Sequence, residues 1–144
     1  MFAIRPATAG DVDALCSFDH IVQHDSHRRT FIRHSVVNGT CFVCVTDEQV
    51  VGYGVLEYSF YGNGFISMLM VRPDYRRRGV GAKLMQYFES VCQTAKLFTS
   101  TNLSNLPMQA LLAKLGYRLS GVIHNLDDGD PELVYFKPVG QASI

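Results

Sequence analysis

The sequence predicts an α/β fold with a single mixed, mostly antiparallel central sheet flanked by helices. The hydrophobic spacing changes between strand and helix periods in the order β-α-α-β-β-β-α-β-α-β-β. Three consecutive strands in the first half are joined by short turns, which is typical of an antiparallel meander. The 144 residues fit one domain, and an apolar share of 47% with a charged share of 18% excludes intrinsic disorder.

The first half of the chain contains one strand, two helices and the meander. Residues 3–5 begin a short strand. Thr8 and Asp11 have the spacing of a capping box, which predicts that a helix starts there. Residues 25–37 predict a second helix, which ends before a glycine. The three meander strands are expected over residues 41–46, 50–60 and 65–71.

The second half alternates helices with strands. Apolar residues at helical spacing predict a helix over residues 79–93. Residues 105–115 predict another helix, because Pro107 lies in its first turn and Gly116 lies just past its end. The strands of this half are expected over residues 96–101, 118–125 and 133–137.

The charges of the chain cancel in total but are segregated along it. Lys and Arg number 13, as do Asp and Glu, so no global field attracts nucleic acid or an anionic membrane. Residues 72–83 hold five basic side chains and one acidic one, whereas residues 127–132 hold four acidic side chains and no basic one. The N-terminus lacks the pattern of a signal peptide, and no stretch approaches a membrane span of about 20 apolar residues. We therefore expect a cytoplasmic protein.

Two patterns suggest metal or redox chemistry, and both have a simpler interpretation. Cys41 and Cys44 form a C-x-x-C within a predicted strand, where residues three apart point to opposite faces, and no second pair follows. His20, His24 and His27 would share one face of a helix, but histidines near arginines are more often a solvated face. We predict reduced thiols and no metal.

The residues that carry chemistry form a basic, glycine-containing turn between a strand and a helix. Its pattern is R-x-x-G-x-G, with Arg76, Gly79 and Gly81 at the fixed positions. The backbone N–H groups of a helix's first turn bind anions, and glycines let a phosphate approach closely. The spacing differs from a Walker A loop, and Leu84 stands where a dinucleotide fingerprint needs its third glycine. Adjacent arginines at a helix start are unfavourable alone, and a bound polyanion removes that conflict.

At these residues the chain resembles the GNAT superfamily of N-acetyltransferases. R-x-x-G-x-G is that family's acetyl-CoA pyrophosphate loop, and the V-x-P at residues 71–73 precedes it as in the family. Residues 105–117 match the family's later stretch, and residues 4–8, followed by Asp11, are a common family N-terminus. The resemblance implies direct transfer of the acetyl group of acetyl-CoA to a primary amine of a small molecule or protein.

The resemblance also implies which residues bind acetyl-CoA. The strand before the loop would contact the pantetheine arm through its backbone, and the loop amides would hold the pyrophosphate. Asn105 is either a further contact near the pantetheine arm or a plain helix N-cap. The cofactor-binding residues expected are Leu69, Met70, Val71, Arg76, Arg77, Arg78, Gly79, Val80, Gly81, Ala82 and Asn105.

The catalytic residues depart from the family pattern. Leu112 stands where many relatives place a proton-donating Tyr, and residues 65–71 lack the Glu that some relatives use as a base. Tyr117, Glu57 and Tyr135 are the candidates that remain, and our hypothesis is that no single side chain dominates. The alternative function is a GNAT-fold module that binds CoA as a sensor or regulator without acetyl transfer.

The acceptor side is less defined. The acidic turn of residues 127–132 is either a solvated turn or a rim that attracts a cationic amine. In relatives, the region between the first strand and Cys41 lines the acceptor side. We therefore expect this region to be able to bind an anionic group on the substrate. The expected partners are acetyl-CoA and an amine acceptor, without nucleic acid or membrane, and a homodimer is an expectation because family members often dimerise.

Overall fold

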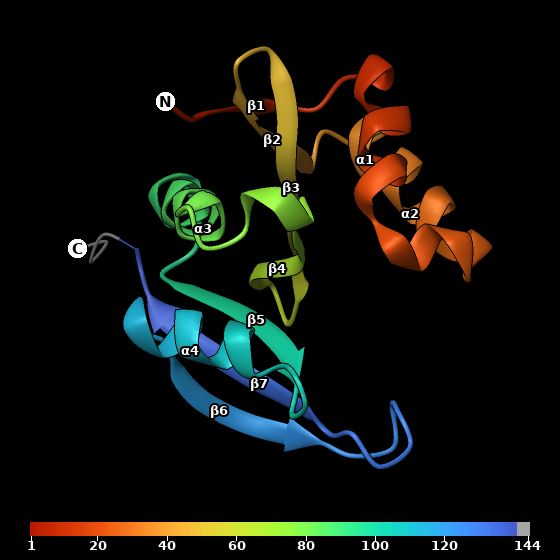
Figure 1. The fold of residues 1–144 in the computed structure, drawn as a ribbon. Helices are drawn as coiled ribbons and strands as arrows, with labels where there is room; N and C mark the ends of the chain where they lie inside the picture. Colours follow the sequence, from red (N-terminus) through yellow and green to blue (C-terminus); the bar gives the residue numbers. More distant parts are fainter. Residues whose placement is uncertain (141–144) are drawn as a thin grey trace. The chain divides into compact units, whose positions relative to one another are not determined.

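The computed structural model describes residues 1–140, and its strands and helices follow the predicted order (Figure 1). In this part of the chain the strands are β1 (Ala3–Pro6), β2 (Cys41–Thr46), β3 (Gln49–Phe60), β4 (Asn63–Val71), β5 (Lys96–Asn102), β6 (Arg118–Ile123) and β7 (Glu132–Pro138). The helices are α1 (Val12–Phe18), α2 (Ser26–Val37), α3 (Val80–Val91) and α4 (Leu106–Lys114). Short 3-10 helices are η1 (Ala9–Asp11), η2 (His20–Gln23) and η3 (Pro73–Tyr75).

The strands form one mixed sheet in the order β1-β2-β3-β4-β5-β7-β6. The pairs β1/β2, β2/β3, β5/β7 and β6/β7 are antiparallel, and β4/β5 is parallel. The predicted mixed, mostly antiparallel sheet is therefore confirmed. None of the described helices is long and apolar enough to cross a membrane.

The chain divides into two compact units, and β3, β4 and α3 run through both. The first unit comprises Met1–Leu56 and Met68–Tyr87, and the second comprises Glu57–Ser67 and Phe88–Ile144. The expectation of one domain over residues 1–144 stays a prediction.

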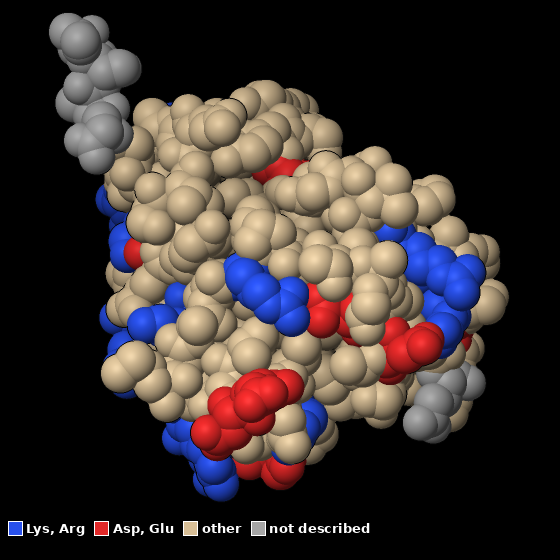
Figure 2. All heavy atoms as spheres, turned by 90° about the horizontal axis from the view of Figure 1, so that it is seen from above, with Lys and Arg blue, Asp and Glu red and all other residues tan. Residues whose placement is uncertain are grey.

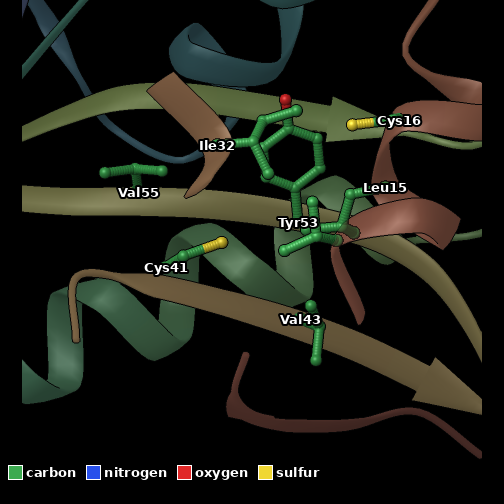
Figure 3. Packing of buried hydrophobic residues seen from close by; sticks show 8 residues of the cluster. Leu15, Cys16, Ile32, Cys41, Val43, Tyr53 and Val55 are labelled. Atoms are coloured by element: carbon green, nitrogen blue, oxygen red, sulfur yellow. The ribbon is translucent and has the colours of Figure 1, made fainter. Parts of the chain in front are cut away.

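The core of the first unit lies where α1 and α2 meet the strands β2 and β3. Figure 3 shows Leu15 of α1 and Ile32 of α2 beside Tyr53 and Val43 of the strands, all of them fully buried. Alternate residues of β2 and β3 contribute to this cluster because successive strand side chains point to opposite faces. The helices supply residues at turn spacing, so the apolar periodicity of the sequence accounts for this core.

The predicted capping box opens α1 through η1. The backbone N–H of Thr8 donates to Oδ2 of Asp11 at 2.7 Å. The guanidinium of Arg5 donates to both carboxylate oxygens of Asp11, at 2.8 and 3.0 Å. The hydrogen bonds from Arg5, followed by those from Thr8, lower the pKa of Asp11 to about 2 despite partial desolvation. Asp11 thus joins β1 to the start of the first helix.

We expect Asp11→Asn to lower the free energy of unfolding by about 1 kcal/mol at pH 7, because the box loses its charged acceptor. The folded pKa lies below the ordinary value of 3.8, so the stabilisation is complete above about pH 4. It is lost as the pH falls towards 2. The free energy of unfolding, measured with urea between about pH 4 and pH 2, should therefore change less with pH in the variant than in the wild type. Asp13→Asn, at an exposed carboxylate, is the control. Identical pH slopes for wild type and Asp11→Asn would contradict the assignment.

The second unit is organised by β5, β7 and β6, which lie side by side in that order (Figure 1). One face of β5 is buried through Leu97 and its alternate neighbours. On the other face Phe98 stacks on Phe136 of β7 with ring centroids 5.7 Å apart. Phe60 and Phe65 extend this aromatic row at centroid distances of 4.8 to 5.1 Å. Aromatic pairs across neighbouring strands stabilise the sheet here.

The C-x-x-C cysteines lie in β2 and point to opposite faces, as the strand spacing predicts. Cys41 belongs to the core cluster under α1 and α2, whereas Cys44 pairs with Gly52, which faces α3. Burial raises the pKa of Cys41 to about 11 and also raises the pKa of Cys44, so both thiols stay protonated near neutral pH. The four cysteines are free.

The three histidines do not share one helix. His20 lies in η2, His24 follows it, and His27 lies in the separate helix α2. The described residues contain no group of three His, Cys, Asp or Glu side chains that could hold a metal ion.

Candidate active site

The basic turn lies in the first unit, between the end of β4 and the start of α3. Arg77 and Gly79 have positive φ values of 64° and 88°, so the backbone is left-handed at two positions of the turn. Nε of Arg76 donates to the backbone oxygen of Val71 at 3.3 Å, which ties the turn to the end of the strand. A Cβ atom on Gly79 would meet no other atom within 4 Å. The glycine therefore leaves open space beside the turn rather than accommodating a packed neighbour.

The charges of the turn are only partly compensated. Arg72 is paired with Asp74 at 2.7 and 2.9 Å, and this contact lowers the pKa of Asp74. The ring of Tyr75 contacts two guanidinium groups, with Arg72 at 4.7 Å and Arg78 at 4.9 Å from its centroid. None of the ion pairs found among the described residues involves Arg76, Arg77 or Arg78. The exposed turn therefore retains positive charge for a polyanion.

This positive charge is local. On the face shown in Figure 2, basic and acidic side chains occur in small groups of both signs, with broad areas of other residues between them. Because Lys and Arg together equal Asp and Glu in number, attraction of an anion depends on the arrangement at the turn rather than on the net charge of the protein.

The first turn of α3 presents backbone donors next to these arginines. The first helical hydrogen bond runs from the N–H of Lys83 to the oxygen of Gly79, at 2.9 Å. The N–H groups of residues 80–82 precede it and have no acceptor within the helix. Val80 and Leu84 are buried and fix the helix on the sheet. A fixed helix N-terminus, open space at a glycine and three arginines together fit a phosphate-containing ligand.

The strand before the turn continues past its parallel partner. The ladder pairs Gly64–Ile66 of β4 with Leu97–Thr99 of β5, and β4 runs on to Val71. The backbone N–H of Arg72 donates to Val51 of β3 at 2.8 Å, so the end of β4 is held from its β3 side. Residues 69–71 are half-buried. We expect their other edge to offer backbone N–H and C=O groups to an extended ligand.

Known proteins share the sequence pattern and the fold of this chain. Residues 11–117 match the model of the acetyltransferase (GNAT) family. An acetyltransferase of the GNAT family from Bacillus cereus ATCC 10987 is 33% identical, with a TM-score of 0.90, over 98% of this chain and 99% of that one. The chain belongs to the GNAT acetyltransferase family.

Two more distant structures share the fold. The ribosomal-protein-S18-alanine N-acetyltransferase from Escherichia coli is 19% identical, with a TM-score of 0.77, over 99% of this chain and 96% of that one. A protein from Bacillus anthracis str. Ames, assigned as a streptothricin acetyltransferase and solved with acetyl coenzyme A, is 17% identical with a TM-score of 0.61. That match covers 68% of this chain and 61% of the other. No curated protein matches the chain.

Asn105 of this GNAT protein lies in the second unit and caps α4. Its Oδ1 accepts a hydrogen bond from the backbone N–H of Met108 at 3.2 Å. The N-cap interpretation is thus confirmed, and contact with the pantetheine arm stays a prediction.

Of the three catalytic candidates, Tyr117 is the most buried, with 5% of its surface exposed. Its hydroxyl donates to Oε2 of Glu89 at 2.9 Å, and Nζ of Lys137 lies 2.9 Å from Oε1 of the same carboxylate. Burial raises the pKa of Tyr117, and the charge of Glu89 raises it further. This phenol therefore holds its proton and joins α3 to the start of β6, while Lys137 joins the same carboxylate to β7.

The other two candidates lie elsewhere in the second unit. The carboxylate of Glu57 on β3 accepts a hydrogen bond from the hydroxyl of Ser67 on β4. Tyr135 lies on β7, where it pairs with Thr99 of β5, and both Glu57 and Tyr135 are half-buried. Tyr117 and Glu57 thus have different hydrogen-bond partners. The catalytic roles of all three residues stay predictions.

Two carboxylates of the acidic turn, those of Asp127 and Asp130, have partners within the second unit. Asp127 accepts from Nδ2 of Asn102 at 2.9 Å, and Asp130 accepts from the N–H and hydroxyl of Ser104 at 2.9 and 2.6 Å. Figure 1 shows this loop extending past the ends of β6 and β7. These bonds support the interpretation as a structured, solvated turn, and attraction of a cationic amine stays a prediction.

Some residues of the site gave no recognisable signal in the sequence. Tyr75 directly precedes the motif, and its contact with two arginines depends on the path of η3. Glu89 is the hydrogen-bond partner of Tyr117, 28 residues away in sequence, and Ser67 is the partner of Glu57, 10 residues away. The helical spacing places Glu89 on α3 without revealing which strand or turn it would meet.

Proposed function

We propose that this protein is an acetyl-CoA-dependent N-acetyltransferase that moves the acetyl group directly to a primary amine of a small molecule or a protein. The observation that carries the proposal is the turn from Arg76 to Gly79, which ends at the N–H groups of α3 that have no acceptor within the helix. Arg76, Arg77 and Arg78 with the amides of residues 77–82 would hold the pyrophosphate, and Leu69, Met70 and Val71 the pantetheine arm. A structural relative solved with acetyl coenzyme A supports this choice of ligand.

The reaction requires a proton to leave the amine. An alkyl amine with a pKa near 10.4 is mostly protonated at neutral pH and must be neutral to attack the thioester carbon. The new C–N bond forms as the C–S bond breaks, and the thiolate takes up a proton to leave as CoA thiol. A backbone N–H near Met70 would stabilise the charge that develops on the thioester oxygen.

One observation favours a second candidate function, CoA binding without acetyl transfer. Leu112, at the position where many family members place a Tyr, is fully buried and cannot donate a proton. A CoA-binding sensor or regulatory module would need the turn but no proton donor. Binding and turnover must therefore be measured separately.

The test combines calorimetry with an assay of CoA-thiol release. We expect acetyl-CoA to bind and its thiol to be released steadily in the presence of at least one primary amine from a panel of amino acids, polyamines, aminoglycosides and peptides. Binding without release across the whole panel would favour the sensor function. Absence of binding would contradict both candidate functions.

The same assay tests the hypothesis that no single side chain dominates. Tyr117→Phe, Glu57→Gln and Tyr135→Phe should each lower kcat by less than about a thousandfold, because water can carry both protons. The free energy of unfolding is measured alongside, since Tyr117→Phe also removes a bond to Glu89. A larger loss in any one variant, with acetyl-CoA binding retained, would identify that residue as the principal acid or base.

A further inference from the structure

A buried polar network in the first unit lies outside the turn and the catalytic candidates. Asp19, at the end of α1, is fully buried. Its carboxylate accepts three hydrogen bonds: from the N–H of Ile21 at 3.1 Å, from the hydroxyl of Tyr53 at 2.5 Å and from Nη1 of Arg28 at 2.9 Å. Burial and the bond to Asp19 raise the pKa of Tyr53, so its phenol stays a donor. The network fixes the position of Arg28.

The guanidinium of Arg28 is held against β4. Its Nη1 also lies 3.2 Å from the sulfur of Met68, the residue that directly precedes the strand segment expected to bind acetyl-CoA. The side chain is 17% exposed, so it still reaches the surface. The bonds to Asp19 and Met68 both use Nη1. Nε and Nη2, on the other edge of the guanidinium, take part in neither of these two bonds, and we infer that this edge contacts a ligand.

Stability alone does not account for this arrangement. A buried ion pair contributes little compared with apolar residues of the same volume, because both charges lose their hydration. The surrounding cluster of the first unit is apolar, so apolar residues in place of Asp19 and Arg28 would have extended it. Arginine is also the side chain whose planar fork matches a carboxylate with two parallel hydrogen bonds, and Asp19 and Met68 fix its orientation in advance.

We propose that Arg28 binds a carboxylate of the acceptor, so that the acceptor is an amine that also carries a carboxylate. This inference rests on the proposed acetyl transfer and specifies its substrate class. Two sources supply the same chemistry: a free amino acid, through its α-carboxylate, and a peptide with an acidic residue near its N-terminus. Polyamines and aminoglycosides, which lack a carboxylate, should be poor acceptors.

The experiment compares acceptors that differ only in the carboxylate. Free amino acids are assayed against their amides, and peptides with Asp or Glu near the N-terminus against peptides with Asn or Gln. We expect kcat/KM to be at least about tenfold higher for the carboxylate member of one pair. The pair that shows this preference distinguishes the free amino acid from the acidic peptide. Preference for the amides or for polyamines would overturn the inference.

Variants then test whether Arg28 is responsible. Arg28→Lys keeps a positive charge beside Asp19 but loses the fork, so it should abolish most of the carboxylate preference through KM while leaving the KM for acetyl-CoA unchanged. Arg29→Gln is the matched control, because Arg29 is the neighbour on the same helix and pairs with the exposed Asp13. An unchanged preference in Arg28→Lys would overturn the assignment.

Binding of the same compounds in the presence of CoA, measured by calorimetry, separates this inference from the proposed function. If no amine is acetylated, carboxylate-dependent binding that is lost in Arg28→Lys would still support the role of Arg28, and the proposed acetyl transfer alone would fail. Equal binding of carboxylates and amides to the wild type would contradict the inference whatever the turnover.

Discussion

Replacing Gly79 with alanine is expected to weaken acetyl-CoA binding about tenfold to a hundredfold, which corresponds to roughly 1.4–2.7 kcal/mol. Gly79 has φ +88°, a conformation that costs an L-residue about 1–2 kcal/mol. The added Cβ meets no protein atom within 4 Å. It enters the open space where we expect the pyrophosphate to approach the backbone. The substitution should therefore lower the affinity for acetyl-CoA more than it lowers the free energy of unfolding. Calorimetric titration with acetyl-CoA measures the change.

Gly39 provides a matched control for this substitution. It lies in the same unit, has φ +73°, and a Cβ there also meets nothing within 4 Å. Gly39→Ala should therefore lose a similar free energy of unfolding, about 1–2 kcal/mol, with acetyl-CoA affinity unchanged. Equal affinities in Gly79→Ala and Gly39→Ala would show that the ligand does not approach the turn at Gly79.

The parts of the fold that the sequence predicted well are those fixed by neighbouring residues. The bond from Thr8 to Asp11 spans three residues, and so does the cap from Asn105 to Met108. Both follow from the preference of short polar side chains for the backbone N–H groups at a helix start. The opposite orientations of Cys41 and Cys44 follow in the same way from the two-residue period of a strand.

The glycine-containing turn is also recognisable from the amino-acid sequence alone. The positive φ at Gly79 is a conformation that glycine adopts without strain, so a glycine at this position indicates a left-handed backbone. The left-handed conformation at Arg77 was not predictable, because arginine carries no such preference. It results from the path that the chain must take between β4 and α3.

Contacts between distant segments could not be read from the sequence. The bond from Tyr53 to Asp19 spans 34 residues, and the contact from Arg28 to Met68 spans 40. Hydrophobic periodicity places each residue on a strand or helix but does not say which polar groups meet once the elements pack. The end of α1 at Asp19 and the separate 3-10 turn that follows likewise depend on the bond to Ile21. For the same reason, the sequence could not show that His20 and His27 belong to separate helices.

Gly52 of β3 carries the second large expected effect, because it links the packing of the first unit to the turn. A Cβ on Gly52 would lie 2.8 Å from Cγ1 of Val80 and 3.1 Å from the backbone oxygen of Met70. Gly52→Ala should therefore displace the start of α3 and the end of β4 together. We expect the free energy of unfolding to fall by about 1–3 kcal/mol and acetyl-CoA binding to weaken at least tenfold. Urea unfolding and calorimetry measure the two effects on the same protein.

A second substitution separates the two shortest contacts that a Cβ on Gly52 would make. Val80→Ala in the Gly52→Ala background removes the 2.8 Å contact. It leaves the contact with the oxygen of Met70, because this is a backbone atom that no side-chain substitution removes. Stability should therefore recover only in part. Gly121→Ala in β6, where a Cβ meets nothing within 4 Å, is the strand control and should change neither quantity appreciably. If Gly52→Ala lost stability but bound acetyl-CoA like the wild type, α3 and β4 could shift without affecting the ligand, and the proposed roles of Val80 and Met70 would be wrong.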